Sequence, residues 1–585
     1  MSDQKSSVLT KLRFLMPIIL GGVIFSMLVV MPLLRSRNLP ILQDTGPSLT
    51  GHILAGSFAH EQKDLSAAIK YYEVALGVNS DNPALLEKLF SLYMSAGDMD
   101  KAVGLAPLLL NKEQDVQQAQ LVLAVEKFKD KKYEQAEAII EQTRDDPFSV
   151  FVKNMFLMWA AYGRDEDELA RAHAETLLGL NTLNTLARWN IARLFEALGD
   201  DKRANELFIS VIQKNAQNNV MRGSSFFSDY MGFLVAQGRG DEAMMLLESH
   251  LPQKDQTPYT LDAYRVVETP NKRNALSPAE GLAMGFLELG VIFSGELPAE
   301  ITLPYLHQAL WLNNKSDKAR VVIGELLTGM GDENRALDIY GAVTSSSVSR
   351  IFARLSEARI LENLGRKAEA QSLLEKLADK ETHAFTLQSL ADFYRRDEQM
   401  AKAELIYNKL IDALGEDESL NWELYFYRGI TLEQQDKWDA AEADLLRARR
   451  LSGNQPFVLN YLGYSWIDNG VNLYQGLEMI KKAVAQEPRN GFFVDSLGWA
   501  FYRMKDFDTA VQFLEKATEL EPDDPEIIDH LGDALWQSGR QIEARYQWRR
   551  ALALEDESAK QKEIEDKIDH GVLQDAAGAG SGTSI

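Results

Sequence analysis

The sequence of 585 residues contains no cysteine. This absence excludes disulfide frameworks, thiolate zinc sites, cysteine nucleophiles and an acylated lipoprotein cysteine. Basic residues are fewer than acidic ones: the sequence has 62 Lys and Arg and 86 Asp and Glu, which gives a formal net charge of −24. We expect no nucleic-acid partner, since binding to phosphates requires a basic face that displaces counterions. Apolar residues make up 45% and charged residues 25%, which is typical of a globular protein.

Motifs for catalysis or metal binding are missing as well. The eight histidines are scattered, and the sequence has no H-E-x-x-H, no glycine loop ending in Gly-Lys and no G-x-S-x-G. The Arg-Gly-Asp string at Arg239–Asp241 lies between two expected helices and is interpreted as a turn. We therefore expect a protein that is not an enzyme, with no catalytic residues, no metal site, no cofactor and no small-molecule substrate.

Long uncharged runs are rare, and one is conspicuous. Leu15–Leu34 is twenty residues without a charge, preceded by three basic residues and followed by two. A helix of that length spans about 30 Å, the thickness of the hydrocarbon core of a membrane. We predict an uncleaved transmembrane signal anchor; the alternative is a cleaved signal peptide, which usually has a shorter apolar run and a small-residue cleavage site. The basic bias favours an exported body, with the cytoplasmic face as the alternative.

Internal repetition is clearest in the last third of the chain, in NYLGYSWIDNG, VDSLGWAFYRM and IDHLGDALWQSGR. Their shared glycines, Gly463, Gly498 and Gly532, are 35 and 34 residues apart, and Pro488 and Pro522 close the first two units. This pattern resembles the tetratricopeptide repeat (TPR), a helix–turn–helix unit of about 34 residues. Small residues at fixed places allow the second helix of a unit to approach the first.

Counting back on this frame yields fourteen candidate units, most of them 32 to 39 residues apart and one pair 59 apart. We predict an all-α fold: a TPR helix–turn–helix solenoid, or superhelix, preceded by one N-terminal transmembrane helix. The aligned positions are Gly56, Phe90, Ala124, Ala160, Ala192, Met231, Gly290, Gly324, Ala358, Ala391, Gly429, Gly463, Gly498 and Gly532.

The predicted domain organisation follows from this frame. The long interval contains four prolines, and it is interpreted as a hinge, a loop or an eroded repeat with a helix fragment at Thr260–Glu268. In chain order we expect a short basic tail (1–14), the transmembrane signal anchor (15–34), a spacer (35–48), an N-terminal TPR array (49–250), an irregular Pro-rich connection (251–282), a C-terminal TPR array (283–554), a capping helix (555–570) and a flexible tail (571–585).

In the resembled family, the first helix of each unit lines a concave groove. The resemblance implies that aromatic side chains would supply contact area there, that Asn460 would bond a peptide backbone and that the carboxylates would favour basic side chains. The alternative is that the rings pack between units. The candidate partner-binding residues are Phe457, Asn460, Tyr464, Phe492, Asp495, Trp499, Tyr502, Arg503, Asp529, Asp533 and Trp536, and the same positions include Ile467, Asp468, Glu526 and Gln537.

The region Gly463–Trp548 is also similar to the C-terminal part of a proteobacterial group of envelope TPR proteins. Some of these are lipoproteins that present substrates to a carboxyl-terminal processing protease, whereas this chain has no acylatable cysteine. The resemblance implies a non-enzymatic scaffold or adaptor in the bacterial inner membrane, with a periplasmic body that binds other proteins or extended peptides. Its partners would be a periplasmic protease or an envelope assembly complex. The alternatives are a TPR scaffold for envelope polysaccharide export or assembly, and an envelope hydrolase or transferase.

Overall fold

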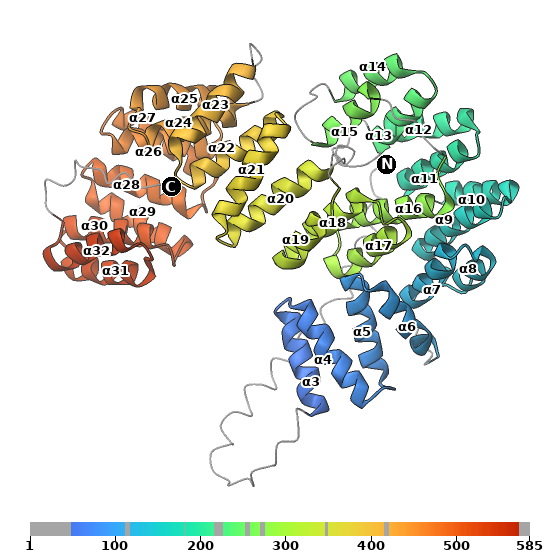
Figure 1. Cartoon of the computed structure of the whole chain (residues 1–585). Helices are drawn as coiled ribbons and strands as arrows, with labels where there is room; N and C mark the ends of the chain where they lie inside the picture. The colour runs from blue at the N-terminus through green and yellow to red at the C-terminus, as the bar shows by residue number, and fades with distance from the viewer. Residues whose placement is uncertain are drawn as a thin grey trace, which may run out of the picture. The chain divides into compact units, whose positions relative to one another are not determined.

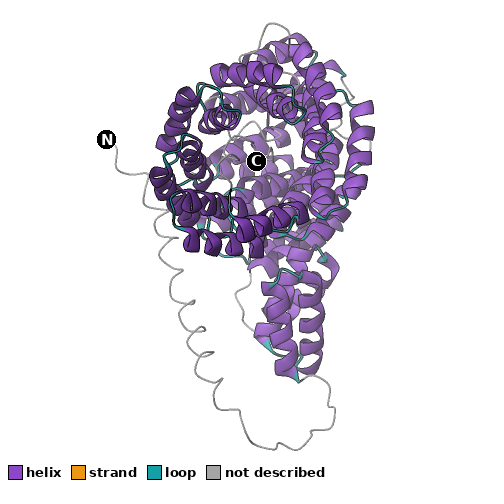
Figure 2. Cartoon of the chain, turned by 90° about the vertical axis from the view of Figure 1, so that its left-hand side faces the viewer, coloured by secondary structure: helices purple, strands orange, loops and turns teal. Residues whose placement is uncertain are grey.

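The computed structural model describes residues 48–111, 117–180, 182–215, 226–251, 258–269, 275–344, 349–414 and 421–572. Within these ranges every regular element is an α-helix and there is no strand (Figures 1 and 2). None of these helices is long and apolar enough to cross a membrane. The predicted anchor Leu15–Leu34 lies outside the described residues.

The chain divides by its internal contacts into two compact units, Met1–Leu89 and Phe90–Ile585. The described part of the first unit contains α3 (Leu49–Glu61), α4 (Leu65–Val78) and the start of α5 (Pro83–Ala96). A carboxylate oxygen of Asp64 accepts a hydrogen bond from Ala67 N at 2.9 Å and caps α4. The ring of Tyr72 lies against α3 at Gly56, where a Cβ would be only 2.9 Å from it. The aligned glycine therefore marks the place where the two helices touch.

In the second unit, successive helices along the chain pack against one another (Figure 1). Asp98 caps α6 and Asp146 caps α9, because each carboxylate accepts backbone N–H groups of the first turn. After the C-terminal part of α5, the helices are α6 (Met99–Leu110), α7 (Gln117–Lys129), α8 (Tyr133–Ile140), α9 (Pro147–Gly163), α10 (Asp167–Gly179), α11 (Asn184–Ala197), α12 (Asp201–Asn215), α13 (Phe226–Ala236) and α14 (Gly240–His250).

The Pro-rich connection contains one helix, α15 (Pro258–Glu268), which packs against α13, α14 and α20. Leu261 is buried in a small cluster with Ile351. The guanidinium of Arg265 donates to Glu381 at 3.0 Å, and this ties the connection to the C-terminal array. The described part of the connection is thus packed on both sides.

The C-terminal helices continue the pairs. Each first helix makes a close contact with its second: a Cβ at Gly463 would be 2.8 Å from the carbonyl oxygen of Gly476, and one at Gly498 would be 2.6 Å from Leu514. The helices are α16 (Pro278–Ser294), α17 (Ala299–Leu312), α18 (Asp317–Met330), α19 (Glu333–Gly341), α20 (Ser349–Asn363), α21 (Lys367–Lys380), α22 (Ala384–Arg396), α23 (Met400–Leu414), α24 (Trp422–Glu433), α25 (Trp438–Leu451), α26 (Pro456–Asp468), α27 (Leu473–Gln486), α28 (Gly491–Arg503), α29 (Phe507–Leu520), α30 (Pro525–Gln537), α31 (Gln541–Leu554) and α32 (Ser558–His570).

The repeat frame matches these helices unit by unit. Each of the fourteen aligned positions lies in the first helix of a pair, and only α15 and α32 stand outside the pairs among the described helices. The turn within most pairs contains a left-handed residue, such as Gly331 with φ 79° or Lys505 with φ 62°. The described chain is therefore the all-α helix-pair solenoid that the sequence predicts.

Candidate functional site: the inner helices of the C-terminal array

The first helices of the N-terminal array are partly covered by the chain itself. Helix α16 packs on α9 and α11. The contact is close, because a Cβ at Gly281 would clash with the ring of Trp159, and one at Gly285 would be 3.0 Å from Asn190. Trp159 and Asn190 are fully buried, and the Trp159 indole Nε1 donates to Asn190 Oδ1 at 2.8 Å.

The positions of α11 that would line a groove are buried as well. Trp189 is 0% exposed and its indole Nε1 donates to the carboxylate of Asp229 at 3.1 Å. Burial raises the pKa of Asp229 to about 6, although Arg193 and Lys318 oppose this shift. The side of α11 that would line a groove is therefore part of the hydrophobic core. The C-terminal array remains as the candidate binding region.

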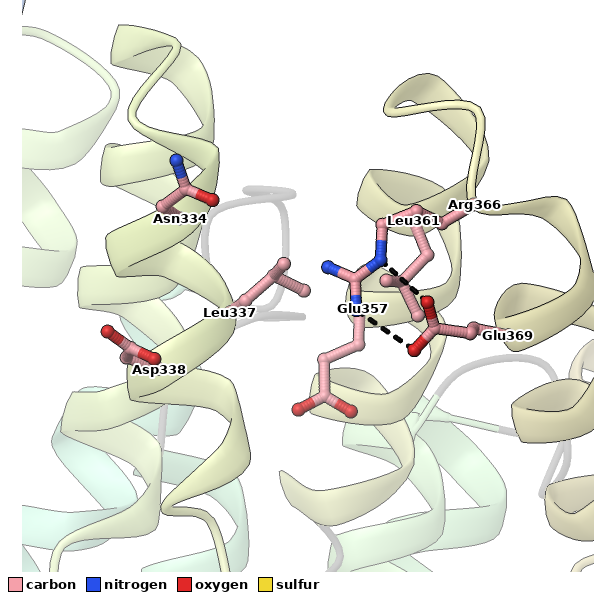
Figure 3. A pocket seen from close by; sticks show the side chains of 7 residues that line it. All are labelled: Asn334, Leu337, Asp338, Glu357, Leu361, Arg366 and Glu369. Carbon is pink, nitrogen blue, oxygen red and sulfur yellow. Dashed lines mark hydrogen bonds and ion pairs between the residues drawn. The ribbon is translucent and has the colours of Figure 1, made fainter.

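One open pocket of about 400 Å³ lies at α19, α20 and α21 (Figure 3). Its polar lining is already paired in part: Arg366 donates to Glu369 at 2.8 and 2.9 Å, and Arg354 donates to Glu357. Burial raises the pKa of Glu357. The residues that line the pocket are Asn334, Leu337, Asp338, Glu357, Leu361, Arg366 and Glu369. They include no pair of nucleophile and base that would indicate a catalytic reaction.

Further along the array, several candidate residues link the first helices of successive units. Asn460 Nδ2 donates to Ser496 Oγ at 3.0 Å, which joins α26 to α28. His530 Nδ1 lies 3.0 and 3.1 Å from the two carboxylate oxygens of Asp495, which joins α28 to α30. Arg503 forms an ion pair of 2.5 Å with Asp468 and also joins α28 to α26.

The last of these links involves the C-terminal helix. Lys567 of α32 reaches Asp529 at 2.5 Å and Asp533 at 3.1 Å. The indole Nε1 of Trp548 donates to the second oxygen of Asp533 at 3.0 Å. Trp536 lies beside Trp548, with ring centroids 5.5 Å apart. Helix α32 thus continues the row of first helices, and the carboxylates of α30 serve to hold it.

Exposure separates the candidate residues into two groups. Asn460, Asp495, Tyr502 and Asp533 are buried, and Tyr464, Trp499, Arg503, Asp529 and Trp536 are partly buried. Only Phe457 and Phe492, at 40% and 49%, are exposed. The predicted carboxylates and the amide thus mainly connect helices, whereas these two phenylalanines present apolar area to solvent. Whether any of the eleven residues contacts a partner stays a prediction.

The tryptophan in the middle of this region is stacked between two rings. Trp499 lies 4.2 Å from the imidazole of His530 and 4.6 Å from the ring of Tyr502, with interplanar angles of 20° and 15°. Burial lowers the pKa of His530, but Asp495 and nearby carboxylates outweigh it and raise the pKa to about 9. The imidazole is therefore protonated at neutral pH, and the stack includes a cation.

On α26 and α28, two buried polar atoms have no hydrogen-bond partner among the described residues, Asn460 Oδ1 and Trp499 Nε1. The first is an acceptor and the second a donor. A buried polar atom without a partner costs free energy, so such atoms are typical of sites where water or a ligand completes the bonding.

The structure also adds an aromatic cluster that the sequence reasoning missed. The ring of Trp422 lies 5.3 Å from Phe457, and that of Phe426 lies 5.8 Å from Phe457 and 5.5 Å from Tyr461. Trp422 and Phe426 belong to α24, one unit before the three that the sequence analysis considered. The same repeat frame, applied to that unit, would have indicated Phe426 but not Trp422, which lies one residue before its first groove position.

The class of protein follows from these observations: an all-α array of helix pairs whose inner helices carry aromatic and hydrogen-bonding groups. A model of the tetratricopeptide repeat family matches residues 495–524, which contain α29 and most of α28. A TPR repeat-containing protein of Pseudomonas aeruginosa is 28% identical over 219 residues, which cover 37% of this chain and 36% of that protein. The chain thus spans about a third of the length of this relative. Residues 495–524 thus match one tetratricopeptide repeat, and the described helix pairs follow the same pattern along the chain.

Solved structures with similar helix arrangements include the crystal structure of the APC/C hetero-tetramer Cut9-Hcn1, with 15% sequence identity, a TM-score of 0.38 and coverage of 89% of this chain and 96% of that one. A tetratricopeptide repeat protein from Parabacteroides merdae is 16% identical, with a TM-score of 0.38 and coverage of 44% of this chain and 100% of that one.

Proposed function

We propose that the protein is a non-enzymatic scaffold or adaptor that binds segments of partner proteins along the inner helices α24, α26 and α28 of the C-terminal array. One observation carries this proposal: the exposed rings of Phe457 and Phe492 lie on the same helices as two buried polar atoms that lack partners. Aromatic anchors beside hydrogen-bonding groups are characteristic of protein interfaces.

The proposal includes a membrane location. The support is the uncharged run Leu15–Leu34 and the distribution of charge, because residues 1–37 contain five basic side chains and one acidic side chain while the rest of the chain carries the net negative charge. In this proposal the anchor crosses the bacterial inner membrane once and the helical body lies in the periplasm. The alternative places the body on the cytoplasmic face.

The proposed partners are envelope proteins, with a periplasmic protease or an envelope assembly complex as the first expectation. This expectation rests on the similarity of Gly463–Trp548 to envelope TPR proteins. The alternative is a scaffold of an envelope polysaccharide export or assembly system, and the identity of captured proteins would separate the two. A hydrolase or transferase activity is not favoured, because the pocket at α19–α21 has no catalytic pair among its lining residues.

The experiment is affinity capture from detergent-solubilised envelopes with the full chain. The test variant is Phe457→Ala/Phe492→Ala, and the control is Tyr474→Ala, which removes a ring that is 74% exposed on the second helix α27. We expect the double variant to lose specific partners that wild type and control retain. Identical sets of captured proteins from all three would contradict the assignment to the inner helices.

A further inference from the structure

In the last units of the array, a first helix contacts the first helix of the preceding unit through a fixed position, two residues before the aligned one. Ser496 Oγ accepts a hydrogen bond from Asn460 Nδ2 at 3.0 Å, which joins α28 to α26. His530 Nδ1 lies 3.0 Å from a carboxylate oxygen of Asp495, which joins α30 to α28. The position two residues after the aligned one lies about one turn further along the same face of the helix.

The first unit differs from the others at these two positions. They hold Leu54 and Phe58 of α3, which are 62% and 64% exposed. In each of the other thirteen aligned units, at least one of the two positions is buried and neither is exposed. Helix α3, the earliest helix that the structure describes, thus presents to solvent a surface that is covered in every later unit. We call Leu54 and Phe58 the α3 face.

The α3 face carries no charge, although the protein is acidic. The only charged residue of α3 is Glu61, its last residue, whereas the whole chain has a net charge of −24. The net charge makes two copies repel each other, but contact through the α3 face buries apolar side chains and no charge. A lipid surface is less suited, because helices that lie on membranes are usually rich in Lys and Arg, and α3 has neither.

The last pair of the array is already covered. Helix α32 follows it, and Lys567 holds α32 on Asp529 and Asp533 of α30. The α3 face of a second copy therefore cannot continue the array after its last pair without displacing α32, as a head-to-tail filament would require. A contact between two α3 faces about a two-fold axis remains, and it closes the assembly at two copies.

We infer that two copies of the chain associate through the α3 face, with Leu54 and Phe58 of one copy packed against the same residues of the other. Each copy supplies an apolar helix surface of the kind that receives another helix elsewhere in the array. This contact goes beyond the proposed function, because it joins two copies of the chain and uses none of the C-terminal helices that we propose bind partners.

Cysteine crosslinking in intact cells tests the inference, because the chain has no cysteine of its own. Two copies of the full chain with different affinity tags are produced together, each with Leu54→Cys, and are treated with a short, membrane-permeant bismaleimide. Capture through one tag and detection of the other identifies a product that contains two copies. We expect this product from Leu54→Cys. The control Ile542→Cys, at a residue that is 88% exposed on α31, should give none above background.

A second substitution tests the apolar contact itself. Adding Phe58→Glu to Leu54→Cys should lower the yield of the two-copy product at least about fivefold, because the contact would bury carboxylates without a counter-charge. Adding Ile542→Glu instead should leave the yield unchanged. Thermal unfolding of the Phe58→Glu chain, followed by circular dichroism, should match that of wild type, since Phe58 is mostly exposed.

Three results would overturn the inference: no two-copy product from Leu54→Cys, equal yields from positions 54 and 542, or a yield that Phe58→Glu does not change. A product that contains only one tag would also overturn it, because another protein or residues 1–47 of the same chain would then cover the α3 face. Affinity capture that depends on Phe457 and Phe492 would stand in all of these cases, since both residues lie on other helices.

Discussion

His530 and Asp495 form a buried ion pair between the first helices of two successive units, with Nδ1 3.0 and 3.1 Å from the two carboxylate oxygens. The pair lies 35 residues apart in the sequence, one repeat length. It also orients the imidazole that stacks on Trp499 at 4.2 Å. This ion pair thus holds α28 and α30 together, and it also holds in place one of the two rings that stack on Trp499.

This pair predicts a pH-dependent stability. The pKa of His530 is raised to about 9, above the value of about 6.5 for an unfolded histidine, so its stabilisation is fully present below pH 6.5 and is lost as the pH rises through 9. We expect His530→Gln to lower the free energy of unfolding by about 2 kcal/mol more at pH 6 than at pH 10, measured by urea denaturation. An equal loss at both pH values would show that the imidazole is not charged in the fold.

The attachment of α32 predicts the effect of a second substitution. Lys567 is the cation between Asp529 and Asp533, and its side chain is only 15% exposed. Lys567→Met leaves buried carboxylates without a counter-charge, which costs about 3 kcal/mol. We expect the amides of α32 to exchange with deuterium faster in this variant, while those of α26 and α27 keep their wild-type rates. Unchanged exchange in α32 would contradict this role.

The close contact of helices within a pair predicts opposite signs for two glycine substitutions. A Cβ at Gly532 would lie 2.3 Å from the indole of Trp548, which is fully buried and cannot move aside. Gly532→Ala should therefore destabilise the protein by about 1–3 kcal/mol. Gly329 in α18 has nothing within 4 Å of its Cβ position, so Gly329→Ala should stabilise by about 0.5–1 kcal/mol. Thermal unfolding of the two variants checks the contrast, and a shift of the same sign in both would refute it.

The turns within the pairs predict a stabilising change. Lys505 has φ 62°, a left-handed conformation that is unfavourable for a residue with a Cβ. Lys505→Gly should raise the stability by up to about 1 kcal/mol, and Gly539→Ala, at φ 86°, should lower it by a similar amount. Gly295→Ala is the matched control, since Gly295 has φ −89° and open space around its Cβ position. A destabilised Lys505→Gly variant would mean that contacts of the lysine outweigh its backbone strain.

Much of the fold could be predicted from the sequence because each unit is built from local contacts. The spacing of small residues located the first helix of most pairs, since a small side chain allows the second helix to pack closely, and the repeat length placed the pairs aligned at Phe90 and Met231. The placement of α16 on α9 and α11 could not be predicted, because it depends on contacts between distant units. Gly281 and Gly285, four residues apart, mark that contact, and without the structure they look like ordinary helical glycines.

The candidate site was predicted only in part. The frame correctly placed Asp495 and Asp533 on first helices, but it did not show that a cation two helices further along the chain neutralises each of them. That signal was present, because Asp495 and His530 are separated by one repeat length. The solvent exposure of each side chain could not be predicted from the repeat frame. Equivalent positions hold different residues, such as Phe457 in α26 and Glu526 in α30, and tertiary packing decides which of the rings is exposed.

The central claim is that partners bind on the inner side of the C-terminal helices. Because the chain has no cysteine, a single Phe492→Cys or Tyr474→Cys substitution carries a photo-crosslinker at one defined place. The measurement is the yield of crosslinked partner in intact cells from each position. We predict crosslinks from position 492 on α28 and none from position 474 on α27. Equal yields from both positions, or crosslinks from 474 alone, would contradict the account.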